Sequence, residues 1–294
     1  MITGVDITER KDLEDQLRQA QKLEAIGQLA AGIAHEINTP TQYVGDNIRF
    51  LKDSWAPIAG LLSLCQTAGQ AGEDGAHSAE FQSKLSQLSE QADLEYLMKE
   101  IPNAIDQSLE GLQRVAKIVR AMKEFSHPGS EEKRAVDINK AIETTITVAR
   151  NEWKYVADVT VHLDASLPLV PCLLGEFNQV ILNLIINAAH AVAGVVGDGS
   201  QSKGKITITT TRDGDWAQIA IADSGAGIPE EIRPRIFEPF FTTKPVGKGT
   251  GQGLTLAHTV IVNRHQGQIW FESKMGQGTA FFVRLPLGTG TAVS

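Results

Sequence analysis

Cysteine is scarce in this sequence, and so are long apolar runs. Only two cysteines, Cys65 and Cys172, occur among the 294 residues, far apart and without the spacing of a metal site. We therefore expect reduced thiols and a cytoplasmic protein. No apolar run approaches the roughly 20 residues that cross a bilayer, and the run at 180–186 is interrupted by Asn183. The chain does not open with a basic segment and an apolar core, so no signal peptide is expected.

Basic residues are also in the minority. Lys and Arg number 27 against 35 Asp and Glu, which gives a net charge of -8. This balance argues against a general nucleic-acid binder, whose binding face would be basic. An acidic chain can still bind a nucleotide, because a few local cations and helix N-termini suffice to hold phosphates. Apolar residues make up 42% of the chain, enough for ordinary cores, and the length favours two domains.

The first part of the chain carries apolar residues at intervals of three and four, which predicts long amphipathic helices. His35 lies two positions from both Ile33 and Ile37, about 200° around a helix from each, so it should face away from the apolar seam. Pro40 should bend the helix, because it cannot donate to the carbonyl of Glu36. Residues 69–79 are expected to form a loop. A second helix should carry the apolar residues Leu94, Leu97, Ile101, Ile105, Leu112, Val115, Val119 and Met122.

Two long helices with narrow apolar stripes make a poor core by themselves. A second copy of the chain could cover the stripes and give a dimeric four-helix bundle. The alternative is an intramolecular hairpin packed on the rest of the chain. Pro102 either kinks the second helix or begins a new one. Polar residues at 128–134 read as a linker and domain boundary.

The remainder of the chain mixes helices with strands linked as hairpins, which favours an α/β two-layer sandwich. The whole chain is therefore expected to be α+β. Helices are expected at 139–153, 176–195 and 254–264, and strands at 159–163, 205–211, 216–222, 268–273 and 279–285.

Asp223 continues an alternating apolar row that runs from Ala217 to Ile221. Its carboxylate should therefore face the buried side of the strand, which is costly unless it receives hydrogen bonds. The amine of an adenine ring could supply one. Gly225 and Gly227 follow and would let the backbone approach a flat ligand. The alternative is an Asp that merely starts a turn.

Asn183 and Asn187 lie four residues apart on one face of an apolar helix, with His190 near that face. Buried amides need partners, and a hydrated magnesium ion with phosphate oxygens is a suitable one. Amides that hydrogen-bond within the core are the alternative.

A glycine-rich run, Gly247–Gly253, leads into the helix that begins at Leu254. Backbone N–H groups at such a helix start can hold phosphates, and Lys244 and Lys248 add positive charge. The run lacks the Gly-Lys-Ser/Thr ending of a Walker loop, and a flexible linker is the alternative. Three aromatic residues precede it and either pack in the core or dock a mobile loop: Phe237, Phe240 and Phe241.

Taken in order, these segments resemble bacterial sensor histidine kinases of two-component signalling. The resemblance covers residues 12–287. It rests on five segments that are similar to the phosphoacceptor, N, first glycine, F and second glycine boxes of that family: His35–Pro40, Asn183–Ala188, Asp223–Gly227, Phe237–Thr242 and Gly247–Gly253.

The resemblance implies an organisation for the whole chain. It implies the end of a PAS-type sensor domain at 1–11, so the natural protein is expected to continue upstream. It implies a dimerisation and histidine-phosphotransfer hairpin at 12–127, the linker at 128–134 and an ATP-binding domain at 135–288, of the kind shared with gyrase and certain chaperones. Residues 289–294 would be a flexible tail. The implied partners are a second copy and a response-regulator receiver domain, with no membrane segment in this piece.

The resemblance also implies roles for individual residues. His35 would attack the γ-phosphate of ATP through Nε2, while Glu36 would accept a proton from the other ring nitrogen or orient it; a solvated surface acid is the alternative for Glu36. Thr39 would position a water for dephosphorylation of the regulator. Asn187, helped by Asn183, would hold Mg²⁺, and Asp223 would bind adenine. Contacts to phosphates or nucleotide would come from Gly225, Gly227, His190, Lys244, Lys248, Gly249, Gly251, Gly253 and Leu254.

The sequence departs from the family pattern in three places. Asn38 stands where many members carry a basic residue, and Gln252 occupies a site that is often apolar. The connection at 50–95 is longer than usual. It is either an accessory docking element or simply a pair of longer helices. A related hypothesis is an ATP-hydrolysing conformational machine, but Glu176 lies eleven residues before Asn187, which disfavours it as a general base. A non-catalytic nucleotide-binding scaffold is the third hypothesis.

Overall fold

The computed structural model describes residues 8–70, 79–126, 132–199, 202–244 and 251–288. The chain divides into two compact units, one formed by Ala34–Val119 and the other by Met1–Ile33 together with Arg120–Ser294. Parts of three predicted segments lie outside the described residues: 1–7 of the sensor-domain end, 128–131 of the linker and the tail at 289–294. The predicted domain boundaries therefore stay predictions.

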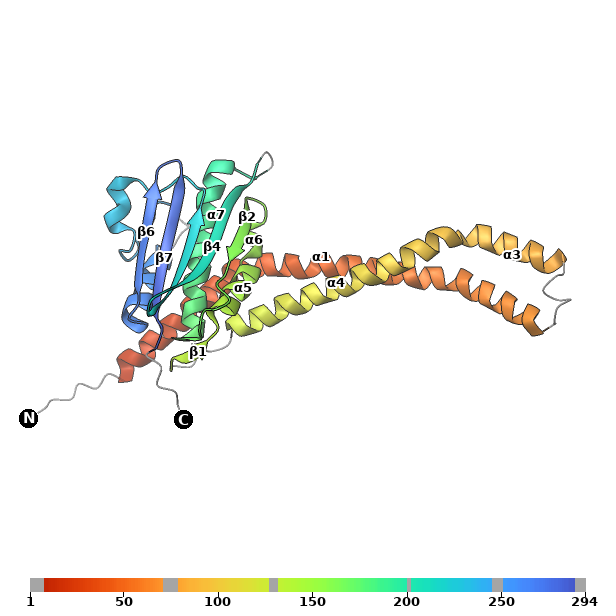
Figure 1. Ribbon diagram of the computed structural model, residues 1–294, viewed down its shortest axis with the longest axis horizontal. Coiled ribbons are helices and arrows are strands. Elements are labelled where there is room, and N and C mark those ends of the chain that lie inside the picture. The colour runs from red at the N-terminus through yellow and green to blue at the C-terminus, as the bar shows by residue number, and fades with distance from the viewer. Residues whose placement is uncertain (1–7, 71–78, 127–131, 200–201, 245–250, 289–294) are drawn as a thin grey trace, which may run out of the picture. The chain divides into compact units, whose positions relative to one another are not determined.

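The helical unit is an antiparallel hairpin built on α1 (Thr8–Gln70), with α3 (Ala79–Ala92) and α4 (Leu94–Ser126) returning along it (Figure 1). Helix covers residues 50–70 and 79–92 of the long connection, so the described part of that connection is longer helix. The loop was expected at 69–79, but residues 69, 70 and 79 are helical, and 71–78 lie outside the described residues. Asp93 separates α3 from α4 with a φ of 43°, and its Oδ1 accepts from the backbone N–H of Tyr96 at 3.3 Å.

Proline ends neither long helix. α1 runs through Pro40 and Pro57, and α4 runs through Pro102. Around Pro40, Thr39 and Thr41 donate through Oγ1 to backbone carbonyls one turn earlier, at 3.0 and 2.8 Å. These hydroxyl bonds flank the position where Pro40 supplies no N–H. Pro102 therefore does not begin a new helix, and the bend at Pro40 stays a prediction.

Each helix of the hairpin presents two adjacent stripes with a spacing of seven. The inner stripe is wholly or partly buried in the single chain and is marked on α4 by Leu97, Ala104, Gly111 and Ile118, and on α1 by Ile33, Pro40, Asn47, Ser54, Leu61 and Ala68. The stripe next to it is apolar yet exposed, and consists of Ile48, Trp55, Leu62, Met98, Ile105, Leu112 and Val119. Two stripes of this spacing are typical of helices that pack on more than one neighbour.

The second unit contains a five-stranded sheet of order β2-β4-β5-β7-β6, in which only β2 and β4 are parallel. Its strands confirm all five predicted strands to within a few residues. Their bounds are β2 Ala157–His162, β4 Gly204–Asp213, β5 Trp216–Asp223, β6 Gln268–Lys274 and β7 Gly278–Pro286.

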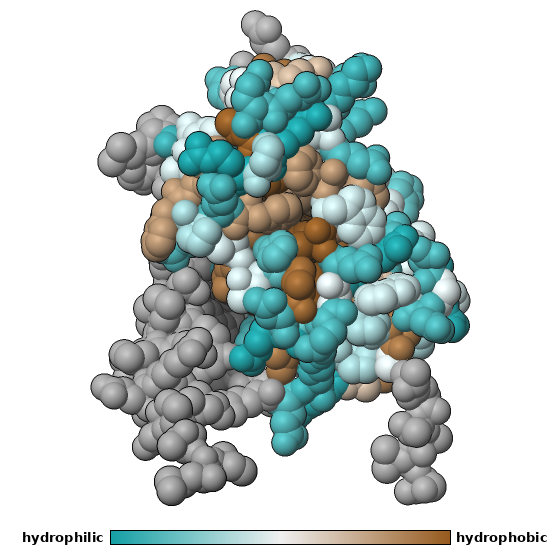
Figure 2. Space-filling view, turned by 90° about the vertical axis from the view of Figure 1, so that its left-hand side faces the viewer, coloured by the Kyte–Doolittle hydropathy of each residue, from teal (hydrophilic) through white to brown (hydrophobic). Residues whose placement is uncertain are grey.

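Helices cover one face of this sheet (Figure 1). The alternating burial along β5 and β7 shows which face of the sheet is covered by helices. On the surface seen in Figure 2, hydrophilic and neutral residues surround apolar residues near the centre of the view. The covering elements are α5 Ile138–Val148, α6 Arg150–Trp153, α7 Leu174–Val196, α8 Gly253–His258 and the π-helix η2 Thr259–Arg264. The two-layer α/β sandwich is therefore confirmed, and with the hairpin the chain is α+β.

The central helix α7 is the only one, among the described residues, that is long and apolar enough by composition to cross a membrane. Its most apolar window is half buried within the protein. Residues such as Phe177, Ile181 and Ile185 are completely buried, and the helix packs against the sheet strands. Burial of α7 against the sheet therefore explains why this helix is so apolar.

Two short strands were not predicted. β1 (Arg134–Val136) pairs antiparallel with β3 (Val170–Cys172), so Arg134 lies in a strand and not in the linker. Cys65 and Cys172 are both free, and burial raises the pKa of the Cys172 thiol to about 12. After β3, His265 accepts from the N–H of Leu173 through Nε2 at 2.9 Å and lies 2.9 Å from the Val260 carbonyl through Nδ1. The neutral ring thus bridges the start of α7 and η2. A further short element, η1 (Glu230–Arg235), follows the first glycine-rich turn.

Candidate functional site

Asp223 is buried at the end of β5, on the covered face of the sheet, as predicted. Its Oδ1 accepts from the backbone N–H groups of Gly225 at 2.8 Å and Thr279 at 3.3 Å. Burial raises the pKa of the Asp223 carboxyl, while these two hydrogen bonds oppose the rise. Because both bonds use Oδ1, the second oxygen is the one that can accept from a ligand amine.

The glycines after Asp223 are required by contacts within the protein. A Cβ on Gly225 would lie 2.6 Å from the backbone of Ala191 in α7. Gly227 has a φ of 81°, and a Cβ there would lie 2.4 Å from the carbonyl oxygen of Lys274. The predicted close approach of these glycines to a flat ligand stays a prediction. The groups that approach them in the structure are α7 and the end of β6.

Asn183 and Asn187 lie on the same face of α7, but they have different partners. Asn183 donates to the carbonyl of Gly253 at 3.2 Å and so ties α7 to the start of α8. The Oδ1 of Asn187 accepts from the Lys244 ammonium at 3.3 Å. The core-amide interpretation therefore describes Asn183, whereas the oxygen of Asn187 faces a cation.

Lys244 also reaches His190, with 2.7 Å between Nζ and Nδ1. Because an ammonium only donates, Nδ1 must accept and the ring proton is on Nε2. Burial, and then the Lys244 charge, lower the pKa of His190 to about 4, so the imidazole is neutral near pH 7. Burial also lowers the pKa of Lys244. Nε2 of His190 carries the proton in this arrangement and can donate a hydrogen bond.

Glu152 in α6 joins this cluster and was not predicted. Its Oε2 lies 3.9 Å from Nε2 of His190, and burial raises the pKa of its carboxyl. No motif carries Glu152, because it lies 38 residues before His190 and reaches it only through the packing of α6 on α7. No pattern in the sequence identifies Glu152, and only the packing of α6 on α7 places it in the cluster.

The second glycine-rich run is described only in part. Lys248 and Gly249 lie outside the described residues. Gly251 has a φ of 66°, and a Cβ there would lie 2.4 Å from the backbone of Phe240. Gly253 begins α8, with Leu254 in its first turn. The predicted entry of the run into a helix is thus confirmed for the described residues.

The three aromatic residues before this run behave differently from one another. Phe237 packs in the core against His258 and Phe271, with ring centroids at 5.3 and 6.2 Å. Phe240 is 72% exposed, with a φ of 64°. The Phe241 ring lies 4.6 Å from the guanidinium of Arg235. The core-packing interpretation therefore describes Phe237 but not Phe240.

In the hairpin unit, His35 is exposed, as predicted from its place on the helix. Glu36, the next residue, is only 6% exposed and forms an ion pair with Arg114 of α4, at 2.5 Å between Oε2 and Nη2. The alternative of a solvated surface acid was therefore wrong. Thr39 is exposed one turn after His35, and its hydroxyl donates to the His35 carbonyl.

The predicted residues thus fall into two groups. The candidate nucleotide-binding residues belong to the sheet-containing unit, and His35, Glu36 and Thr39 belong to the hairpin unit. Among the described residues, no group of three or more His, Cys, Asp or Glu side chains could hold a metal ion.

Comparisons with known proteins agree with this layout. Residues 175–289 match the family described as "Histidine kinase-, DNA gyrase B-, and HSP90-like ATPase". The signal transduction histidine-protein kinase AtoS of Escherichia coli is 30% identical over 284 residues, which cover 96% of this chain and 38% of AtoS. Over nearly its whole length the chain is therefore similar to sensor histidine kinases, and its last part matches the ATPase domain that they share with gyrase B and HSP90. The sensor kinase CckA of Brucella abortus is also 30% identical, over 97% of this chain and 27% of CckA.

Among solved structures, the catalytic domain of histidine kinase ThkA is 31% identical, with a TM-score of 0.46, over 53% of this chain and 95% of that domain. The chain spans 38% of the length of AtoS and 27% of the length of CckA. What the whole proteins sense and bind therefore has to be argued for this chain from its own residues.

Proposed function

We propose that this chain is the kinase core that transfers the γ-phosphoryl group of ATP to His35 and then passes it to an aspartate of a response-regulator receiver domain. The observation that carries the proposal is an exposed histidine followed by a buried, ion-paired carboxylate, on a chain with a buried Asp at a nucleotide-type site.

His35 supplies the nucleophile in this proposal. A neutral imidazole has one ring nitrogen with a free lone pair, and the exposed side chain is open to solvent on α1. Nε2 would form the N–P bond while the bond from the γ-phosphorus to the bridging oxygen breaks and ADP leaves. The proton on the other ring nitrogen would pass toward the Glu36 carboxylate.

The sheet-containing unit would bind the nucleotide. Asp223 would accept from the adenine amine through the oxygen not used by Gly225 and Thr279. Lys244 and His190 would contact phosphate oxygens, the first as a cation and the second as a neutral donor. The backbone at Gly251, Gly253 and Leu254 would contribute N–H groups.

Magnesium would be held at Asn187. Its side-chain oxygen already accepts from a cation, the Lys244 ammonium, so a hydrated Mg²⁺ shared with phosphate oxygens fits the donor set. When bound, the ion would neutralise charge on the phosphates. Asn183 is held by Gly253 and would support the position of α8.

Two further points favour transfer to histidine over ATP hydrolysis. Glu176, the acid on the N-box helix, lies eleven residues before Asn187, about 16 Å along the helix. Its Oε1 also pairs with Arg264 at 3.1 Å. A general base for water would have to come from elsewhere. In a separate hydrolytic reaction, Thr39 would position a water against the phospho-aspartate of the regulator, which releases inorganic phosphate and restores the aspartate.

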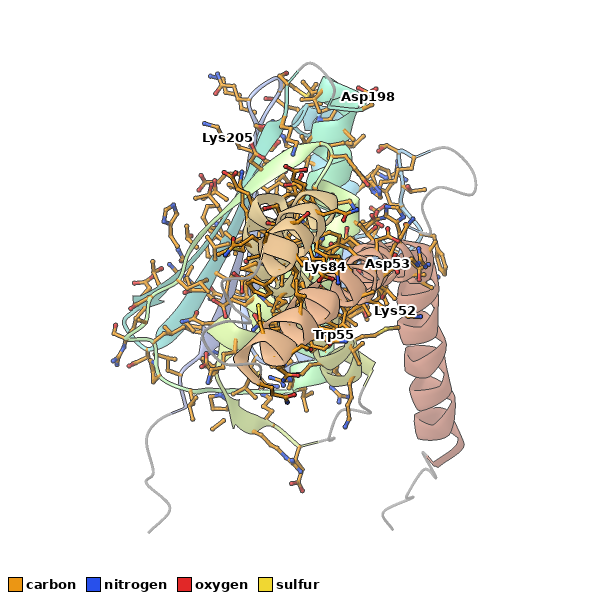
Figure 3. All side chains as sticks on the ribbon, turned by 90° about the vertical axis from the view of Figure 1, so that its right-hand side faces the viewer. Lys52, Asp53, Trp55, Lys84, Asp198 and Lys205 are labelled. Carbon is orange, nitrogen blue, oxygen red and sulfur yellow. The ribbon has the colours of Figure 1, made fainter. Side chains whose placement is uncertain are left out.

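We also propose that the kinase core is a homodimer. The stripe that includes Trp55 (Figure 3) leaves large apolar side chains 43–77% exposed in the single chain. Burying such side chains contributes roughly 1.5–3 kcal/mol each. A second copy with the same stripe would bury them in a four-helix bundle.

The decisive experiment uses γ-labelled ATP. Wild-type protein should acquire acid-labile, alkali-stable label, and His35→Gln should acquire none while binding ATP with unchanged affinity by calorimetry. Labelled protein mixed with receiver domains should then lose its label to one of them. Full labelling of His35→Gln would overturn the assignment of the phosphoacceptor, and labelling of a different residue type would overturn the reaction.

A further inference from the structure

Arg114 is a charged partner of Glu36. The two residues are 78 positions apart, one on α1 and one on α4, and their side chains meet at 2.5 Å inside the hairpin unit. The Glu36 side chain is 7% exposed, whereas that of Arg114 is 40% exposed. The carboxylate is thus enclosed, and the guanidinium reaches it from the rim of the hairpin.

An enclosed carboxylate needs such a partner. Burying a charged carboxylate is costly unless it is paired and hydrogen-bonded, and an adjacent cation favours its ionised form. A guanidinium also fixes orientation, because its donors form a planar fork. Removal of Arg114 would therefore leave Glu36 free to change both its direction and its protonation.

The two helices are held close near this pair. One turn before Arg114, Gly111 faces α1, where an added Cβ would lie 2.7 Å from Val44 and 2.8 Å from Tyr43. Asn47 then donates to the carbonyl of Ala104 at 3.2 Å. These contacts set the register between α1 and α4, so Arg114 meets Glu36 at a fixed position next to His35.

We infer that Arg114 is a positioning residue for phosphoryl transfer, which keeps the Glu36 carboxylate ionised and directed for its role beside His35. The inference rests on the proposed kinase function. In the transfer step the bond from Nε2 to phosphorus forms, the bond to the leaving oxygen of ADP breaks, and the ring proton moves toward Glu36. Arg114 touches neither the phosphate nor the imidazole in this step and acts through the carboxylate.

The test is a set of variants in the full chain: Arg114→Gln, Arg114→Lys, Glu36→Gln and the double variant Glu36→Gln/Arg114→Gln. Arg49→Gln is the matched control, because Arg49 is an exposed arginine of the same hairpin whose partner, Asp46, is exposed too. Initial rates of His35 labelling are measured against ATP concentration to separate kcat from KM. Helical circular dichroism and its melting curve report on folding.

Arg114→Gln should lower kcat about 10- to 100-fold, a part of the roughly 10²–10⁴-fold that acid–base assistance supplies. The KM for ATP should be unchanged, because the nucleotide contacts are elsewhere. Arg114→Lys should recover part of the rate, since it keeps the charge but not the fork. On the Glu36→Gln background, the Arg114→Gln change should produce no further loss, because both residues act as one unit.

Two results would overturn the inference while leaving the proposed function intact. One is Arg114→Gln labelling as fast as Arg49→Gln. The other is an equal loss from Arg114→Gln with and without Glu36, which would give Arg114 an independent role. If Arg114→Gln loses its helical signal, Arg114→Lys replaces it as the test. A reduced kcat with an unchanged KM in Arg114→Lys supports the inference, and a wild-type kcat overturns it. Wild-type protein that acquires no label would overturn the proposed function and the inference with it.

Discussion

Asp223 shows how a single carboxylate can be both structural and functional. One oxygen is held by two backbone N–H groups, and the residue is buried at the end of β5. That arrangement fixes the direction of the second oxygen without any help from a ligand. Such preorganisation is what gives a recognition group its selectivity, because little ordering remains to be done on binding.

Asp223→Asn should weaken ATP binding about 10- to 100-fold, the loss expected when a hydrogen bond to a charged group, roughly 1.5–3 kcal/mol, is removed. The amide can still accept from Gly225 and Thr279 through its oxygen, so the fold should persist. Calorimetry with a non-hydrolysable ATP analogue measures the affinity. Affinity within twofold of wild type would contradict the adenine role.

The residue pairs that the sequence did not predict share a physical reason. Periodicity and motif spacing place residues that are close along the chain, such as Asn183 and Asn187. Arg114 meets Glu36, and Glu152 meets His190, only because separate helices pack. The partners in each pair are too far apart along the chain for a sequence motif to include both, so the pairs are seen only in the tertiary structure.

Buried His265 gives a prediction for the dependence of stability on pH. Mainly through burial, the folded protein lowers the pKa of His265, so between the two values the unfolded chain binds more protons. The stability that the neutral ring contributes is therefore complete above the unfolded pKa, roughly 6.5, and is lost as the pH falls toward the folded pKa. Protonation of Nε2 would remove the acceptor of the Leu173 N–H, while Nδ1 would still donate to the Val260 carbonyl.

His265→Gln should be less stable than wild type by about 1–2 kcal/mol at pH 7.5, because the amide reproduces the two hydrogen bonds imperfectly. The difference should shrink at pH 5.5, where wild type alone pays for protonation. Urea unfolding followed by tryptophan fluorescence at both pH values measures it. A difference that stays constant between the two pH values would exclude His265 as a source of the pH dependence.

At the scale of elements, long periodic segments were predictable and short ones were not. The strands β4, β5, β6 and β7 have seven to ten residues each and were found at the predicted places, and burial alternates along most of β4, β5 and β7. β1 and β3 are three residues each, too short to show a period, and β3 contains Pro171. These two strands form because they pair with each other, and the sequence of one three-residue segment does not show where its pairing partner lies.

Two glycines, one in the hairpin turn before β5 and one in the turn after it, form a matched pair for a test. Gly227 and Gly214 both have a positive φ, 81° and 60°, but a Cβ would meet the Lys274 carbonyl at 2.4 Å in the first case and nothing within 4 Å in the second. Gly214→Ala should cost only the backbone strain, about 1 kcal/mol. Gly227→Ala should cost about 2–4 kcal/mol, because overpacking adds to that strain.

Urea midpoints of the two variants, measured in the full chain at one protein concentration, test this difference. Gly227→Ala should also weaken ATP binding, because the strained turn begins four residues after Asp223. Equal midpoints for the two variants would show that the close approach of β6 does not constrain the turn.

For the whole molecule, the hairpin has more apolar surface than a single chain can cover. The inner stripe is used between α1 and α4, while the adjacent stripe stays exposed over seven large side chains. The sequence analysis placed residues of both stripes in one apolar seam. The two stripes are offset by a single residue, and apolar spacings of three and four residues fit either of them. Only the packing of the hairpin separates the two.

The exposed stripe predicts that dimerisation depends on residues such as Leu112, which is 55% exposed in the single chain. Leu112→Glu should weaken the dimer at least about 100-fold, since two symmetry-related leucines each lose roughly 1.5–3 kcal/mol of burial. Gln113→Glu is the matched control, because it adds the same charge at the next, exposed position. Sedimentation equilibrium measures both. A Leu112→Glu protein as dimeric as Gln113→Glu would mean that some other surface joins the copies, and the exposed stripe would then need a different partner.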